Sequence, residues 1–99
     1  MKNPNSKFDI ATAEAIAISG LGFIGQDGER LGKFLNATGV NPADLRELAG
    51  SSEFLASVLD FLAQDESLLL VFTSENSIDP ELIKPALMRL SGKQGLVSS

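Results

Sequence analysis

The chain has 99 residues, of which 43% are apolar, and a formal charge of −5 at pH 7. This length predicts one domain with a single modest core, and the acidic balance argues against nucleic acid as a partner, since binding DNA or RNA needs a cationic face. The absence of Cys excludes disulfides and thiolate nucleophiles, and the absence of His removes the commonest metal ligand and general base. We therefore expect no enzyme, metal or cofactor.

Signals for a membrane or for export are weak. No apolar run approaches the roughly 20 residues that a bilayer span requires. Lys2 and Lys7 precede an apolar stretch, as in a secretory signal, but Asp9 and Glu14 interrupt it and no convincing cleavage site follows. The sequence predicts a cytoplasmic protein without a membrane partner.

Helical spacing and capping residues organise the first half. Residues 1–8 are expected to form a flexible arm. Apolar residues then recur at helical spacing over 11–25, and Ile18 and Leu21 make this segment apolar nearly all round, so it should lie centrally or be covered by a partner. Asp27 caps a helix over 28–38, and Gly39 supplies a left-handed stop. The side chains expected to face water on this helix are Arg30, Lys33 and Asn36.

The second half continues with the same signals. Asn41-Pro42 starts a short helix over 42–49, and Ser51 or Ser52 caps the next one, over 52–63. Asp65 caps a helix over 66–75, and Asp79-Pro80 starts the last one, over 80–90. Pro85 cannot donate to the carbonyl of Glu81, so we expect a kink or an early 3₁₀ turn there. Residues 92–99 are expected to form a flexible tail.

A shift of 38 positions aligns the two halves of this pattern. Identical residues fall on predicted caps and core positions, where folding would hold them: Ser19 and Ser57, Leu21 and Leu59, Phe23 and Phe61, Gln26 and Gln64, Asp27 and Asp65, Leu31 and Leu69, Phe34 and Phe72, Pro42 and Pro80. We interpret this as an internal duplication of a three-helix unit, with units at 9–50 and 51–91. The predicted fold is all-α, a compact six-helix bundle in which helices 11–25 and 52–63 are equivalent and pack near the centre.

Two short patterns resemble sites of chemistry. The segment from Gly20 to Gly25 fits the G-x-G-x-x-G of dinucleotide-binding folds, but no parallel strand follows it and the equivalent segment Val58–Ala63 has no glycine. Asp65-Glu66-Ser67-Leu68 is similar to the Asp-Ser-Leu of acyl carrier proteins, yet capping explains Asp65 and Ser67. We read neither pattern as a cofactor site.

Carboxylates could in principle form a catalytic or metal-binding pair. Those considered are Asp27, Glu29, Asp60, Asp65 and Glu66. Helix capping, first-turn acids that complement the helix dipole, and a surface position account for all five. No calcium-loop spacing is present.

The candidate interaction surface has two parts. Leu68, Leu69, Leu70, Val71 and Phe72 wrap more than one face of their helix, so this run is either core or a surface for a partner. The second part consists of small residues that would let another helix approach closely: Ala13, Ala17 and Gly20.

Two longer motifs carry a resemblance. They are Glu29-Arg30-Leu31-Gly32-Lys33-Phe34-Leu35-x-x-Thr38-Gly39-x-x-Pro42-x-Asp44-Leu45-Arg46 and Phe54-Leu55-x-x-Val58-Leu59-Asp60-Phe61-Leu62-x-x-Asp65-Glu66-x-Leu68-Leu69. In these the chain resembles a bacterial domain-of-unknown-function family of short all-helical proteins. The resemblance implies bacterial origin and an all-α fold, makes signalling a candidate context, and supplies no activity, ligand or catalytic residue.

Two hypotheses for function follow. The first is a non-enzymatic module that offers a helical face to a protein partner or to a second copy of itself. The second is a small-ligand or nucleotide-binding domain with a crevice between the two three-helix units.

Overall fold

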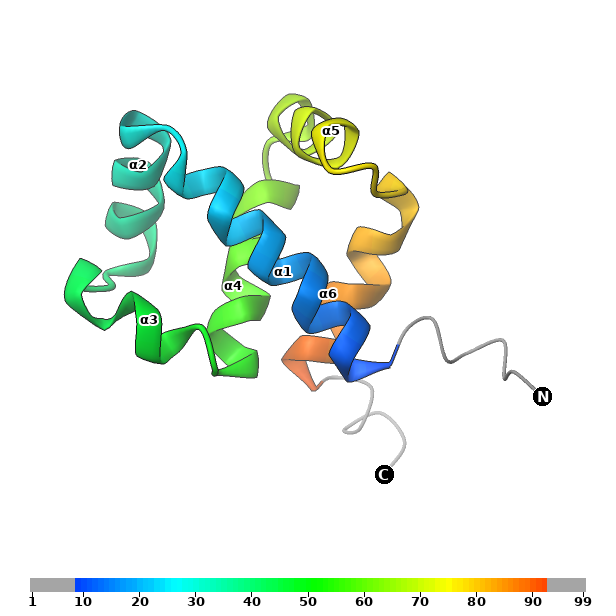
Figure 1. Ribbon diagram of the computed structural model, residues 1–99, viewed down its shortest axis with the longest axis horizontal. Coiled ribbons are helices and arrows are strands. Elements are labelled where there is room, and N and C mark those ends of the chain that lie inside the picture. The colour runs from blue at the N-terminus through cyan, green and yellow to red at the C-terminus, as the bar shows by residue number, and fades with distance from the viewer. Residues whose placement is uncertain (1–8, 93–99) are drawn as a thin grey trace.

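The computed structural model describes residues 9–92, and within this range the chain forms six α-helices and two 3₁₀ turns (Figure 1). The bounds of the elements in chain order are α1 Ile10–Gly25, α2 Gly28–Thr38, η2 Pro42–Asp44, α3 Leu45–Leu48, α4 Ser52–Ala63, α5 Glu66–Glu75, η3 Pro80–Leu82 and α6 Ile83–Ser91. The all-α prediction and the six predicted helical segments are therefore confirmed. The predicted arm at 1–8 and residues 93–99 of the predicted tail lie outside the described residues.

Local chemistry sets the ends of these helices. The Asp27 carboxylate accepts from the backbone N–H of Glu29 at 3.0 Å, and the Asp65 carboxylate accepts from that of Leu68 at 3.1 Å, which confirms both residues as N-caps. Of the two serines considered for α4, Ser51 is the cap. Gly39 ends α2 at φ 72° and Gly92 ends α6 at φ 76°. The expected 3₁₀ turn before Pro85 is present as η3.

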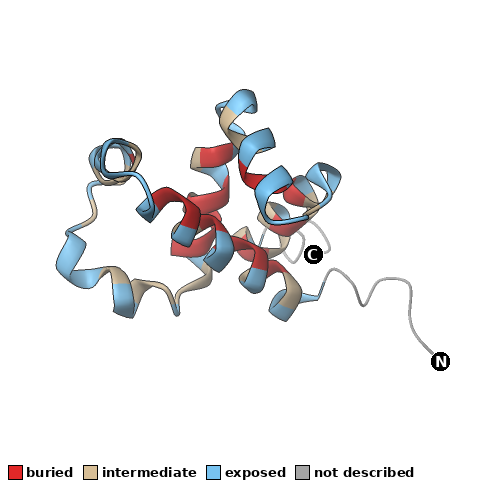
Figure 2. Ribbon diagram, turned by 45° about the horizontal axis from the view of Figure 1, so that its top comes forward, coloured by how far each residue is buried: buried red, intermediate tan, exposed pale blue. Residues whose placement is uncertain are grey.

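Three helices build the centre of the bundle. α1, α4 and α6 pack against one another, α2 packs against α1 and α4, and α5 packs against α4 (Figure 1). Most buried side chains lie on the faces of α1, α4 and α6 that meet (Figure 2). The central packing of α1 and α4 agrees with the prediction, whereas α6 joins them and its counterpart α3 stays at the periphery with only half-buried Leu45 and Leu48.

Aromatic pairs hold α2 and α5 to the centre. Phe72 of α5 packs on Phe23 of α1 with ring centroids 5.4 Å apart, and Phe34 of α2 packs on Phe61 of α4 at 5.3 Å. A shift of 38 positions exchanges Phe23 with Phe61 and Phe34 with Phe72, so each pair corresponds to the other. The internal duplication stays a prediction. A duplicated unit would be expected to repeat such equivalent contacts in both halves.

Candidate interaction surface and the hollow between the two halves

The apolar run at 68–72 divides between core and surface. Phe72 is fully buried, and Leu68 and Leu69 are partly buried against the core. Leu70 and Val71 are each 46% exposed. Successive residues of a helix point about 100° apart, so these two side chains diverge and do not form one flat patch. Of the two alternatives for this run, Phe72 is core and no part of an exposed surface, because it stacks on Phe23.

The predicted small-residue surface of α1 is also buried. Ala13, Ala17 and Gly20 face the interior, and a Cβ atom on Gly20 would lie 3.0 Å from Leu62 Cδ1 and 3.3 Å from Val58 Cγ1. The residues are small because helices approach closely, as expected, but the helices belong to the same chain. As parts of an exposed surface these three residues were predicted wrongly.

The opposite, outer face of α1 is exposed, and the partly exposed Glu14 lies on it one helical turn before Ile18. Ile18, half exposed at 50%, lies near its middle. In Figure 1, α1 crosses in front of α4 and α6 with this side uncovered by any described element. The other exposed residues of this face recur at helical spacing on either side of Ile18: Ala11, Ala15, Ser19, Gly22 and Gly25.

Gly22 is not explained by the fold. No atom lies within 4 Å of the position that its Cβ would occupy, in contrast to the crowded site at Gly20. A glycine inside a helix destabilises it by roughly 0.5–1 kcal/mol relative to alanine. The packing within the chain therefore gives no reason for glycine at this exposed position.

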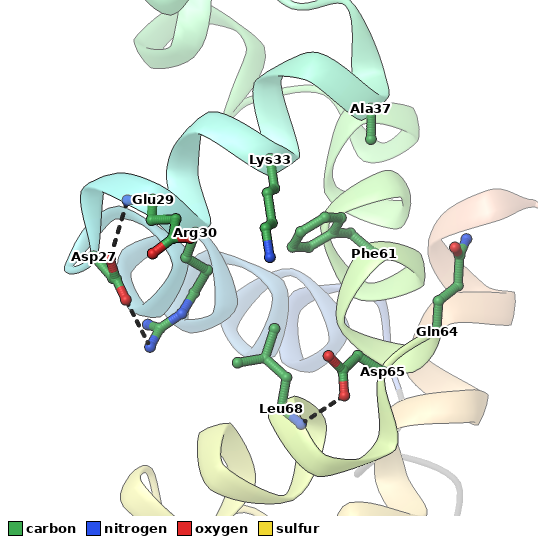
Figure 3. A pocket seen from close by; sticks show the side chains of 9 residues that line it. All are labelled: Asp27, Glu29, Arg30, Lys33, Ala37, Phe61, Gln64, Asp65 and Leu68. Atoms are coloured by element: carbon green, nitrogen blue, oxygen red, sulfur yellow. Dashed lines mark hydrogen bonds and ion pairs between the residues drawn. The ribbon is translucent and has the colours of Figure 1, made fainter.

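A hollow of about 470 Å³ separates α2 from the junction of α4 and α5 (Figure 3). Its apolar lining comes from Ala37, Phe61 and Leu68, and the Lys33 ammonium points into it. The remaining lining side chains are polar or charged: Asp27, Glu29, Arg30, Gln64 and Asp65. Both predicted three-helix units thus contribute to one open, mixed-charge hollow.

Arg30 is the residue of this region whose role was missed from the sequence. It was expected to face water, but its guanidinium carbon lies 4.0 Å from the centroid of the Phe23 ring. Its Nη1 donates to the Phe23 carbonyl oxygen at 2.6 Å, and its Nη2 lies 3.7 Å from an Asp27 carboxylate oxygen. Arg30 follows the last residue of α1 by only five positions, which could have suggested this contact, since a cation is favoured at a helix C-terminus.

The segments that resemble cofactor motifs are helical. Gly20–Gly25 forms the C-terminal part of α1, and the residues before it are helix and not strand. A dinucleotide site would instead need these glycines in a loop between a strand and a helix. In the described part of the chain, no group of three or more carboxylates is placed to hold a metal ion.

A protein-family model matches residues 10–93, a range that takes in all six helices. The chain belongs to the family described as Protein of unknown function (DUF3572). The family resemblance inferred from the two motifs is thereby confirmed. No curated protein and no solved structure gave a match.

Within residues 9–92, no helix combines the length and the apolar character that a membrane span requires. The longest, α1, has 16 residues, fewer than the roughly 20 that a span requires.

Proposed function

We propose that this DUF3572 protein is a non-enzymatic interaction module that binds a protein partner through the outer face of α1. The observation that carries the proposal is Ile18, half exposed at the middle of a helix face whose fully exposed residues are otherwise small. Apolar area removed from water stabilises a complex by roughly 25 cal/mol per Å².

The cellular setting is part of the same proposal. A net charge of −5 favours protein partners over nucleic acid. We place the protein in the bacterial cytoplasm, with signalling as the context that the sequence resemblance suggests.

The test compares two charge insertions at exposed apolar positions. Ile18→Glu puts a carboxylate on the outer face of α1, and Met88→Glu does the same on α6, where Met88 is 39% exposed. Wild type and both variants serve as bait, and each candidate partner is then titrated as a purified protein. Binding that survives in Met88→Glu and is lost in Ile18→Glu supports the proposal. Equal binding by all three proteins contradicts it.

The hollow beside α2 favours a second candidate function, the binding of a small ligand between the two units. Its volume of about 470 Å³ falls within the range of roughly 300–1,000 Å³ typical of ligand pockets. The Lys33 ammonium, the Asp65 carboxylate and the Phe61 ring offer contacts for a ligand that combines charged and flat apolar groups.

A thermal-shift screen tests this second candidate with nucleotides, acyl compounds and divalent cations. A ligand selective for the folded state raises the Tm with its concentration. A ligand that binds in the hollow should raise the Tm of wild type and of the control Lys84→Ala equally, and it should raise the Tm of Lys33→Ala less. The absence of any shift, or an undiminished shift in Lys33→Ala, rules the hollow out as its site.

A further inference from the structure

The hollow beside α2 carries two opposite charges that do not meet. The Lys33 ammonium points into it from α2, and the Asp65 carboxylate points into it from the junction of α4 and α5 (Figure 3). Within residues 9–92, Lys33 forms no ion pair, and the one hydrogen bond to the Asp65 carboxylate runs from the Leu68 N–H to Oδ1. The Lys33 ammonium and Asp65 Oδ2 are therefore both available to a ligand.

The other charges of the lining are grouped at the start of α2. Asp27, Glu29 and Arg30 lie together there (Figure 3). The Arg30 guanidinium is held by the Phe23 carbonyl oxygen and by Asp27. An anionic group that enters the hollow thus finds its cation in Lys33. A cationic group favours Asp65, because Arg30 repels it beside Glu29.

Apolar side chains line the hollow next to this pair of charges. Phe61 and Leu68 are partly buried and pack against the core, which fixes their positions. The Phe61 ring extends from α4 into the same space as the Lys33 ammonium (Figure 3). An aromatic group of a ligand can pack against this ring in an offset or edge-to-face arrangement.

We infer that the hollow binds a free amino acid with an aromatic side chain. Its carboxylate pairs with Lys33, its ammonium pairs with Asp65, and its ring packs on Phe61 and Leu68. The inference rests on the second candidate function, because it uses the same hollow. A ligand with a single charge of either sign would be attracted by one member of the pair and repelled by the other, whereas a zwitterion is attracted by both.

Three probes of the same shape and different charge test this ligand class. L-phenylalanine is the zwitterion, L-phenylalaninamide lacks the carboxylate, and hydrocinnamate lacks the ammonium group. Backbone amide signals in NMR report both the binding site and the Kd. Phenylalanine should shift the signals of α2 and of the junction of α4 and α5. Both analogues should bind roughly tenfold or more weakly, since each loses a charge-assisted hydrogen bond.

Two variants test which residue reads which charge. Lys33→Ala should bind phenylalanine and its amide alike, because no cation remains to select the carboxylate. Asp65→Asn keeps a capping oxygen for α5 and should bind phenylalanine and hydrocinnamate alike. Lys84→Ala, outside the hollow, should keep both preferences of wild type. The spectra of the variants also show that they are folded. A Lys33→Ala or Asp65→Asn protein that keeps both preferences overturns the pairing.

The outcomes separate this ligand class from the second candidate function. No shift with phenylalanine, or equal binding of all three probes by wild type, overturns the amino acid as the ligand. Another compound whose thermal shift depends on Lys33 would then leave the hollow standing as a ligand site. Without any such compound the hollow falls as well, while the interaction module on α1 is tested independently of both.

Discussion

Arg30 binds Phe23 twice, once through the ring and once through the backbone. Its guanidinium group lies over the ring, with the central carbon 4.0 Å from the centroid, and Nη1 donates to the carbonyl oxygen at 2.6 Å. Because Phe23 is in the last turns of α1 and Arg30 in the first turns of α2, this contact fixes the angle between the two helices. Phe23 is buried, so the contact also connects the surface of α2 to the core.

Removing the guanidinium group should therefore destabilise the fold. For Arg30→Met we expect a loss of about 1–2 kcal/mol in the free energy of unfolding, since a charged hydrogen bond and a cation–π contact disappear while an apolar stem remains. Urea unfolding followed by far-UV circular dichroism measures it, because the chain has no Trp or Tyr for fluorescence. Lys33→Met, on the exposed side of α2, is the control and should be nearly neutral. Equal stability of the two variants would show that Arg30 does not join the helices.

Gly20 should tolerate no side chain. Gly20→Ala places a methyl group 3.0 Å from Leu62 Cδ1 and 3.3 Å from Val58 Cγ1, both fully buried. Overpacking a core costs roughly 1–3 kcal/mol, against a gain of up to about 1 kcal/mol in helix propensity. Gly32→Ala should gain the helix propensity without the cost of overpacking, since its added methyl group meets open space. Chemical denaturation of both variants should place Gly20→Ala below Gly32→Ala by about 1–3 kcal/mol. The reverse order would refute the close approach of α4 to α1.

Ser77 and Gly39 offer a reciprocal test of helix ends. They are equivalent under the 38-position shift, and both adopt positive φ, 56° for Ser77 and 72° for Gly39. Ser77 completes a left-handed stop for α5, in which the Ile78 N–H donates to the Thr73 carbonyl oxygen at 2.9 Å. Ser77→Gly should raise stability by roughly 0.5–1 kcal/mol, and Gly39→Ser should lower it by about 1 kcal/mol. Thermal unfolding of both proteins checks the opposite signs, and a destabilised Ser77→Gly would contradict the strain at this residue.

Asp9 should make α1 sensitive to acid. The backbone N–H of Thr12 donates to the Asp9 carboxylate at 2.9 Å and lowers the pKa of this carboxyl below its usual value of 3.8. A carboxyl group whose pKa is lower in the folded state than in the unfolded state stabilises the fold at pH values above its unfolded-state pKa. This stabilisation is lost as the pH falls through the folded-state pKa. Below about pH 4, the stability of Asp9→Asn should thus decline less steeply than that of wild type, because asparagine keeps a capping oxygen and does not titrate. Denaturation midpoints between pH 2 and 6 measure this, and identical slopes would contradict it.

The sequence determined where the helices begin and end. Caps at Asp27 and Asp65, the stop at Gly39 and the Asp79-Pro80 start act over a few residues, so neighbours in the chain suffice to specify them. The burial of Phe34 also followed from helical spacing. Both 3₁₀ turns lie at the predicted Asx-Pro starts, at Pro42 and Pro80.

Tertiary packing decided which faces those helices present. α1 is apolar nearly all round, so its spacing could not distinguish the Ala13 side, which α4 and α6 cover, from the Ile18 side, which stays exposed. Phe72 became core and Leu70 surface for the same reason, within one uninterrupted apolar run. The contact of Arg30 with Phe23 likewise depends on the angle between two helices. Local hydrogen bonding fixes the ends of a helix, whereas the packing of all the described helices around one small core fixes which side of each stays exposed.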